Sequence, residues 1–160
     1  MDKFKRKTYG NFGQFWSDVR FLAKRRKGIK TAMKGDLISP AFRERLMLAV
    51  TAVIGCRYCS QVHTREALVA GISNDEVKKL LSGVVNDCPD KEVIALIYAQ
   101  HWADSNTNPD PKARQKLVET YGKDTTETLE LVLRMIWTGN MMGNTWDRFL
   151  HLLSFGHCGL

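Results

Sequence analysis

The sequence predicts an all-α protein, built as a single-domain helical bundle. Apolar residues recur at spacings of three and four along most of the chain, and no segment alternates polar and apolar residues as a strand does. A length of 160 residues suits one domain with its own core, and 44% hydrophobic and 26% charged residues are ordinary for a globular chain. No apolar run approaches the roughly 18 residues that span a bilayer. A charged N-terminus without a following apolar segment argues against a secretory signal, so we expect a cytoplasmic protein.

The first helix is expected in the N-terminal region, where Gly28 and Gly35 interrupt its continuation. Its apolar positions lie on one helical face and are Phe12, Phe15, Trp16, Val19, Leu22 and Ala23. Ser39 and Pro40 then provide an N-cap and a first-turn proline, which predict a helix over residues 40–54.

A central helical hairpin is expected around Gly55. The helix over residues 40–54 stops there, and a second helix is predicted from Cys56 to Ala70. Ser73 and Glu76 have the spacing of a capping box, which begins a short helix ending at Gly83.

Three further helices complete the predicted bundle. One opens at Pro89 and ends before the turn cluster of residues 106–111, and a short one covers residues 112–121. The last begins at Thr125 or Thr126 and continues to Leu153. Gly139 and Gly143 lie inside it, where they permit a bend or close packing. We interpret its methionine and tryptophan residues as core or subunit interface.

The positive charge is concentrated in the N-terminal region. Residues 1–34 carry 11 basic and 2 acidic side chains, whereas the whole chain has a net charge of +7. We therefore divide the chain into a basic helical arm, residues 1–37, and a helical domain, residues 38–160. Such an arm suits binding to nucleic acid or an anionic membrane, but we favour a solvated helix whose lysine stems lie along the surface.

The cysteines indicate redox or metal chemistry rather than a disulfide framework. Cys56 and Cys59 form a CxxC motif, while Cys88 and Cys158 stand apart and are interpreted as incidental. The histidines outside the motif have no comparable setting; they are His101, His151 and His157.

The CxxC motif falls at a predicted helix start, which suits a reactive dithiol. Residues three apart on a helix have Cα atoms about 5 Å apart, within the range of a disulfide. The helix N-terminus offers free amides and a partial positive charge, which favour the thiolate; the Arg57 side chain either adds to this or points to solvent. His63 follows Cys59 by one turn and is placed to exchange the thiol proton.

Glu44 joins this group only if the chain folds back at Gly55. On one straight helix Glu44 and Cys56 would be about 18 Å apart. In a hairpin, Glu44 and His63 are nearly equidistant from the bend, so the carboxylate is expected to orient the imidazole. The alternative is a surface carboxylate beside Arg43 and Arg45.

Two structural alternatives compete with a redox site. Structural zinc needs four ligands, and the second pair would have to come from Cys88, Cys158 or a distant histidine. The two cysteines of the motif could also be buried packing residues. We expect neither a metal nor a cofactor.

Glu44 followed after eleven residues by Cys56-x-x-Cys59-x-x-x-His63 resembles the active-site motif of the alkyl hydroperoxidase D-like branch of the carboxymuconolactone decarboxylase superfamily. The resemblance covers roughly residues 38–153. It implies an all-helical fold, assembly into homo-trimers or homo-hexamers, and peroxidase activity sustained by a dithiol donor. By position, Cys56 and Cys59 become the redox pair, with His63 and Glu44 as the proton relay. The decarboxylase branch lacks the cysteine pair, which disfavours lactone decarboxylation.

The chain departs from this pattern at two places. The best-known peroxidase members carry a histidine where Tyr58 stands, and a tyrosine hydroxyl is a poor proton carrier near pH 7. The basic arm is also outside the pattern.

The predicted function is a thiol-dependent peroxidase. Cys59, beside His63, attacks the peroxide, and Cys56 condenses with the resulting sulfenic acid, although the two roles are exchangeable. A lipoyl- or thioredoxin-like dithiol then reduces the disulfide at Cys56, which we expect to be the more exposed sulfur. The alternatives are a general dithiol–disulfide oxidoreductase and a redox-sensing interaction module that binds nucleic acid or membrane through residues 1–34.

Overall fold

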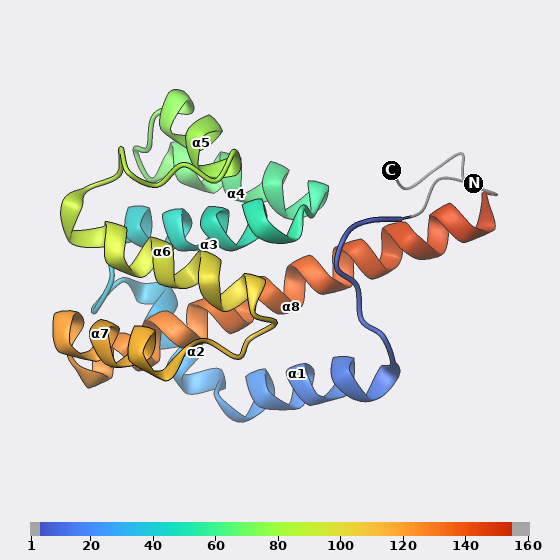
Figure 1. The fold of residues 1–160 in the computed structure, drawn as a ribbon, viewed down its shortest axis with the longest axis horizontal. Coiled ribbons are helices and arrows are strands. Elements are labelled where there is room, and N and C mark those ends of the chain that lie inside the picture. Colours follow the sequence, from blue (N-terminus) through green and yellow to red (C-terminus); the bar gives the residue numbers. More distant parts are fainter. Residues whose placement is uncertain (1–3, 155–160) are drawn as a thin grey trace.

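The predicted all-α architecture is confirmed. The structure, a computed structural model, describes residues 4–154, and within that range it contains helices and no strand (Figure 1). The helices are α1 (Phe12–Lys24), α2 (Arg26–Lys34), α3 (Pro40–Ile54), α4 (Arg57–Val69), α5 (Asn74–Leu81), α6 (Asp90–Asp104), α7 (Pro111–Tyr121) and α8 (Lys123–Leu153).

Local capping determines where the central helices begin and end. The Ser39 hydroxyl accepts a hydrogen bond from the Phe42 amide at 3.1 Å, and Pro40 occupies the first turn of α3. Gly55 ends α3 with φ at 79°, a left-handed conformation that glycine adopts without strain. The Ser73 hydroxyl caps α5 in the same way, at 3.1 Å from the Glu76 amide.

Helix α3 is the centre of the bundle and packs against α4, α5, α6 and α8 (Figure 1). Its residues Leu46, Leu48 and Val50 are completely buried. A helix with neighbours on every side has no polar face to offer, so its polar residues must find partners inside the protein. The same requirement applies to Glu44, which is a residue of α3.

The N-terminal region packs along α8, through both α1 and α2. Asp18 is the buried residue of α1, and it accepts hydrogen bonds from Arg134 at 3.0 Å and from the Tyr9 hydroxyl at 2.8 Å. The apolar face of α1 is not fully buried, because Phe12 is 73% and Trp16 51% exposed. Since α1 lies at the edge of the bundle, with α2 and α8 as neighbours, a wide apolar face cannot be fully covered.

Helix α8 is continuous, but its two halves have different surroundings. The first half is enclosed by the bundle, whereas the second half extends beyond it (Figure 1). Large apolar side chains are exposed on this second half: Met142, Trp146, Phe149, Leu152 and Leu153. Over residues 4–154, no helix combines the length and apolar character that a membrane crossing requires.

Candidate active site

The two cysteines lie at the start of α4, immediately after the bend that ends α3. Cys56 is the N-cap residue of α4, and its sulfur accepts a hydrogen bond from the Cys59 amide at 3.5 Å. Both cysteines are free thiols. A sulfur in the N-cap position faces the unpaired amides of the first helical turn, which stabilise negative charge.

The hairpin brings Glu44 of α3 and His63 of α4 together. Glu44 Oε2 lies 2.8 Å from His63 Nδ1. The surface alternative for Glu44 is wrong, because only 2% of the residue is exposed. Its other oxygen accepts from Arg43 Nε at 3.2 Å, and Arg43 itself is anchored to the Met33 carbonyl at 3.0 Å.

This contact determines the tautomer of the imidazole. A carboxylate can only accept, so Nδ1 of His63 carries a hydrogen and donates to Glu44. In neutral imidazole Nε2 is then left as a proton acceptor. The geometry therefore suits the predicted relay, while the catalytic roles of Glu44 and His63 stay predictions.

The two sulfurs differ in exposure and acidity. Cys56 is completely buried and Cys59 is partly exposed, so the expectation that Cys56 is the more accessible sulfur is wrong. A hydrogen bond from the Cys59 thiol, together with the amides of Tyr58 and Cys59, lowers the pKa of Cys56 to about 6 against the opposing effects of burial and Asp147. The same pairing with Cys56, together with burial, raises the pKa of Cys59. The pairing of the two sulfurs thus favours a thiolate at Cys56 over one at Cys59.

The carboxylate–imidazole pair and the sulfur pair are adjacent but not directly connected. Within residues 4–154, His63 makes no hydrogen bond with either sulfur. His63 follows Cys59 by four residues and therefore shares its face of α4. A proton passing between them needs an intervening water molecule or a side-chain movement.

Two glycines of α8 allow its backbone to approach the sulfurs closely. A Cβ atom at Gly143 would lie 2.6 Å from Cys56 Sγ, and one at Gly139 would lie 3.8 Å from Cys59 Sγ. Of the two possibilities predicted for these glycines, close packing is the one observed, since α8 is continuous through both. This contact with Gly143 also explains why Cys56 is buried.

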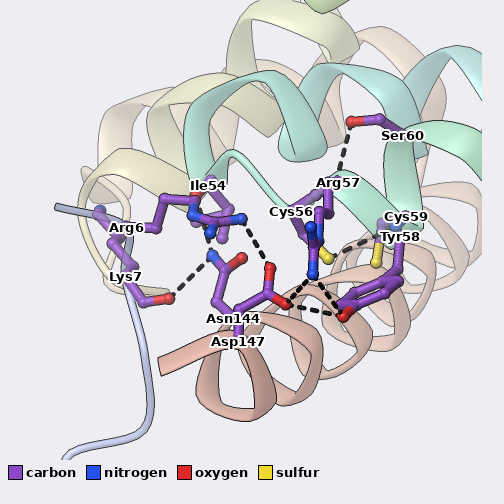
Figure 2. Close-up of polar contacts among 10 residues, drawn as sticks. All are labelled: Arg6, Lys7, Ile54, Cys56, Arg57, Tyr58, Cys59, Ser60, Asn144 and Asp147. Carbon is purple, nitrogen blue, oxygen red and sulfur yellow. Dashed lines mark hydrogen bonds and ion pairs between the residues drawn. The ribbon is translucent and has the colours of Figure 1, made fainter. Parts of the chain in front are cut away.

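Asp147 of α8 is a site residue that the sequence analysis missed (Figure 2). It is completely buried and accepts hydrogen bonds from Tyr58 at 2.7 Å, Arg57 at 2.8 Å and Arg6 at 2.9 Å. The Arg57 charge is therefore paired with a carboxylate rather than directed at the sulfurs or free in solvent. The Tyr58 hydroxyl likewise donates its hydrogen bond to Asp147.

A sequence signal for this face of α8 existed. Asn140, Asn144 and Asp147 recur at spacings of four and three within an apolar stretch, which places three polar groups on one buried face. Asn140 Nδ2 donates to Thr51 Oγ1 at 3.1 Å, and Asn144 Nδ2 donates to the Ile54 carbonyl at 3.1 Å. These contacts attach the end of α3 to α8.

Comparison with known proteins identifies the family. The model of the carboxymuconolactone decarboxylase family matches residues 19–100, half of the chain, including the hairpin with Glu44, both cysteines and His63. The chain belongs to the carboxymuconolactone decarboxylase family. Neither a curated protein nor a solved structure matches it. The matched region ends before α8, so Gly143 and Asp147 lie outside the residues that the family model matches.

The other cysteines and histidines of this family member have different surroundings from the CxxC pair and His63. Cys88 is buried, and burial raises its pKa to about 11, which keeps it a thiol near neutral pH. His101 accepts from the Asp110 amide at 3.0 Å, and His151 is buried with its ring 6.1 Å from that of Phe4. His157 and Cys158 lie outside the described residues. Among residues 4–154, no group of three or more His, Cys, Asp or Glu side chains is arranged to hold a metal ion.

The acidity of Cys56 gives a first prediction. Thiolate absorbance at 240 nm should rise with pH through a midpoint of about 6 in the dithiol protein, because the thiolate predominates above the pKa. Cys59→Ala should move this midpoint upward, since it removes the hydrogen bond that contributes most to the low pKa. Cys56→Ser is the control and should abolish the transition. A midpoint above 8 in the unsubstituted protein would contradict the assignment.

The close approach of α8 gives a second prediction with a matched pair of variants. Gly143→Ala should destabilise the protein by roughly 1–3 kcal/mol, because the added methyl group overlaps Cys56 Sγ. Gly139→Ala meets Cys59 Sγ at an ordinary contact distance and should be neutral or stabilising by about 0.5–1 kcal/mol, the helix preference of alanine. Urea unfolding followed by circular dichroism measures both. Equal stabilities would show that the contact does not restrict position 143.

Proposed function

We propose that the protein is a thiol-dependent peroxidase that reduces peroxides through a dithiol–disulfide cycle of Cys56 and Cys59, with His63 and Glu44 as proton relay. The observation that carries the proposal is the sulfur pair at the N-terminus of α4, where the pKa of Cys56 is lowered to about 6. Membership of a family that includes peroxidases supports it. The cycle begins from the dithiol form, with neither sulfur engaged in a disulfide.

The peroxide reacts at Cys59, because this sulfur is partly exposed and Cys56 is buried. Cys59, which holds the proton in the resting dithiol, first transfers it through water to His63 Nε2, and the Cys59 thiolate so formed attacks the distal oxygen as the O–O bond breaks. The leaving alkoxide or hydroxide takes up a proton and departs as alcohol or water, and Cys59 becomes a sulfenic acid. His63 Nε2, oriented by Glu44, exchanges the proton with Cys59 through water.

Cys56 then closes the disulfide. Its thiolate attacks the sulfur of the Cys59 sulfenic acid and displaces hydroxide, which is protonated to water. Two thiols and one peroxide have become a disulfide, one alcohol and one water.

Reduction of the disulfide follows from the same asymmetry. An external dithiol, lipoyl- or thioredoxin-like, attacks Cys59, which is the accessible sulfur. Cys56 departs as a thiolate, and its low pKa makes it a good leaving group. The second thiol of the donor then attacks the donor's own sulfur in the mixed disulfide, and Cys59 is released as a thiol. The point of attack is thus opposite to the one expected from the sequence.

The division of roles predicts different outcomes for the two serine variants. Cys59→Ser should abolish peroxide consumption and sulfenate trapping by dimedone at the CxxC pair, because the partly exposed sulfur of the pair is removed. Cys56→Ser should also lose turnover but accumulate a trappable sulfenic acid on Cys59, because the resolving thiol is absent. Mass spectrometry after one equivalent of peroxide distinguishes them. Trapping on Cys56 in the Cys59→Ser variant would reverse the assignment.

A general dithiol–disulfide oxidoreductase is the second candidate. The observation that favours it is the combination of an exposed attack site with a good leaving group, which suits exchange with any disulfide or dithiol. Stopped-flow rates of the reduced protein with an alkyl hydroperoxide and with oxidised lipoamide separate the two functions. A peroxide rate no greater than that of free dithiothreitol would leave only the exchange function.

Assembly into a homo-trimer or homo-hexamer is part of the proposal. Large apolar side chains of α1 and of the second half of α8 surround a surface hollow of about 960 Å³, and Phe12, Trp146 and Phe149 are each about half exposed or more. A cluster of exposed apolar side chains is typical of a protein–protein interaction site. Light scattering coupled to size exclusion should give a multiple of the 18.2 kDa chain mass, and Trp146→Glu should reduce it. A monomer at micromolar concentration would reject assembly through this surface.

A further inference from the structure

Asp147 connects three separate parts of the protein at one buried point. Its Oδ1 atom accepts from Tyr58 and Arg57 of α4, and its Oδ2 atom accepts from Arg6 of the N-terminal segment (Figure 2). The carboxylate has no exposed surface, whereas the side chains of Arg6 and Arg57 are 20% and 44% exposed. A buried carboxylate requires such partners, so each of them is held in place by Asp147.

The group held by Asp147 adjoins the buried sulfur. A Cβ atom at Gly143 would lie 2.6 Å from Cys56 Sγ and 3.2 Å from Tyr58 Cδ2, so the sulfur and the tyrosine ring abut the same point of α8. Tyr58 is 37% exposed and Cys56 is not exposed at all. The Tyr58 ring therefore lies nearer the protein surface than Cys56 Sγ does.

Residues 57 and 58 also lie between the two cysteines in sequence. Their side chains are attached to α8 through Asp147, while the backbone between them forms the first turn of α4. Because Cys56 is the N-cap of this turn, the contacts of residues 57 and 58 with Asp147 join the Cys56 end of α4 to α8. No other interaction fixes the Tyr58 hydroxyl within residues 4–154 except its hydrogen bond from Arg57, at 3.0 Å, which itself depends on Asp147.

We propose that Asp147 is a positioning residue of the redox site, which keeps Cys56 closed to external reagents by holding Tyr58 and Arg57 against α8, and that Arg6 completes this closure from the N-terminal segment. The inference rests on the proposed function for its purpose: a closed Cys56 directs both peroxide and reductant to Cys59. Its geometry is independent of that function.

The N-terminal segment contributes through more than Arg6. Asn144 Nδ2 donates both to the Lys7 carbonyl, at 3.0 Å, and to the Ile54 carbonyl, at 3.1 Å, so the segment and the end of α3 share one anchor on α8. Part of the basic arm is therefore a structural element of the site. Its charge at Arg6 compensates the carboxylate that would otherwise repel a thiolate at Cys56.

The test measures alkylation of Cys56 by iodoacetamide as a function of pH, in the full chain with the other three cysteines replaced by serine. The plateau of the alkylation rate at high pH, where the thiolate is fully formed, reports how accessible Cys56 Sγ is to the reagent. The pH midpoint of the rate reports the pKa of Cys56 and therefore the charge around its sulfur. Asp147→Asn should raise the plateau by about tenfold or more, because Tyr58 and Arg57 lose their anchor. It should also lower the midpoint, because a negative charge near the thiolate is removed.

Two controls separate closure from general loosening. Glu130, on the same helix, accepts from a tyrosine and an arginine in the same way, from Tyr98 at 2.8 Å and from Arg114 at 2.8 Å. Glu130→Gln should leave the Cys56 profile unchanged. In a chain with Cys59 as its single cysteine, Asp147→Asn should leave the alkylation of Cys59 unchanged, whereas loosening of the whole site would accelerate both sulfurs.

A plateau rate in Asp147→Asn equal to that of the parent overturns the proposal. If this variant does not fold, as judged by circular dichroism, Tyr58→Phe decides: it removes one hydroxyl, keeps the carboxylate, and should raise the plateau without lowering the midpoint. An unchanged plateau rate in Tyr58→Phe would likewise overturn the proposal. Peroxide consumption is not a readout of this experiment, so loss of the proposed peroxidase function and loss of the closure are distinguishable.

Discussion

The site depends on the close approach of α8 to the bend between α3 and α4. Glycine at position 143 permits this approach, since any side chain there would occupy the space of Cys56 Sγ. Asn144 and Asp147, on the same stretch of α8, then satisfy the Ile54 carbonyl and the side chains of the first turn of α4. Because α3 also carries Glu44, the position of the bend determines where the carboxylate, the imidazole and the sulfurs lie.

Burial gives the two cysteines different properties, although their side chains are chemically identical. Cys56 and Cys59 are three residues apart, yet one faces α8 without exposure and accepts from backbone amides, while the other is partly exposed. The amides stabilise a thiolate that reagents cannot easily reach, and the exposed thiol is the less acidic of the two. Such a pair is suited to a cycle in which one sulfur meets the substrate and the other serves as internal nucleophile and leaving group.

Much of the local structure could be predicted because it depends on neighbouring residues. Ser39 with Pro40 begins α3 and Gly55 ends it, since capping and left-handed backbone are local properties. Glu76 shows the limit of such reasoning: Ser73 caps α5 as expected, but the Glu76 carboxylate accepts from Arg45 at 2.6 Å, a partner 31 residues away. The burial of α1 could not be predicted, because the apolar pattern does not reveal that α1 lies at the edge of the bundle with few neighbours.

By itself, the sequence predicted the helices and the hairpin, and it favoured the pairing of Glu44 with His63, since two positions equidistant from one bend lie at the same level of a hairpin. Only the tertiary structure decided which sulfur is accessible and which carboxylate holds Tyr58 and Arg57. Both outcomes depend on α8. Its residues Gly143, which has no side chain, and Asp147, which is a buried carboxylate, pack against the motif, although Asp147 is 89 residues away from Tyr58 in sequence. Contacts of this kind arise from packing between distant segments, and no spacing within the motif encodes them.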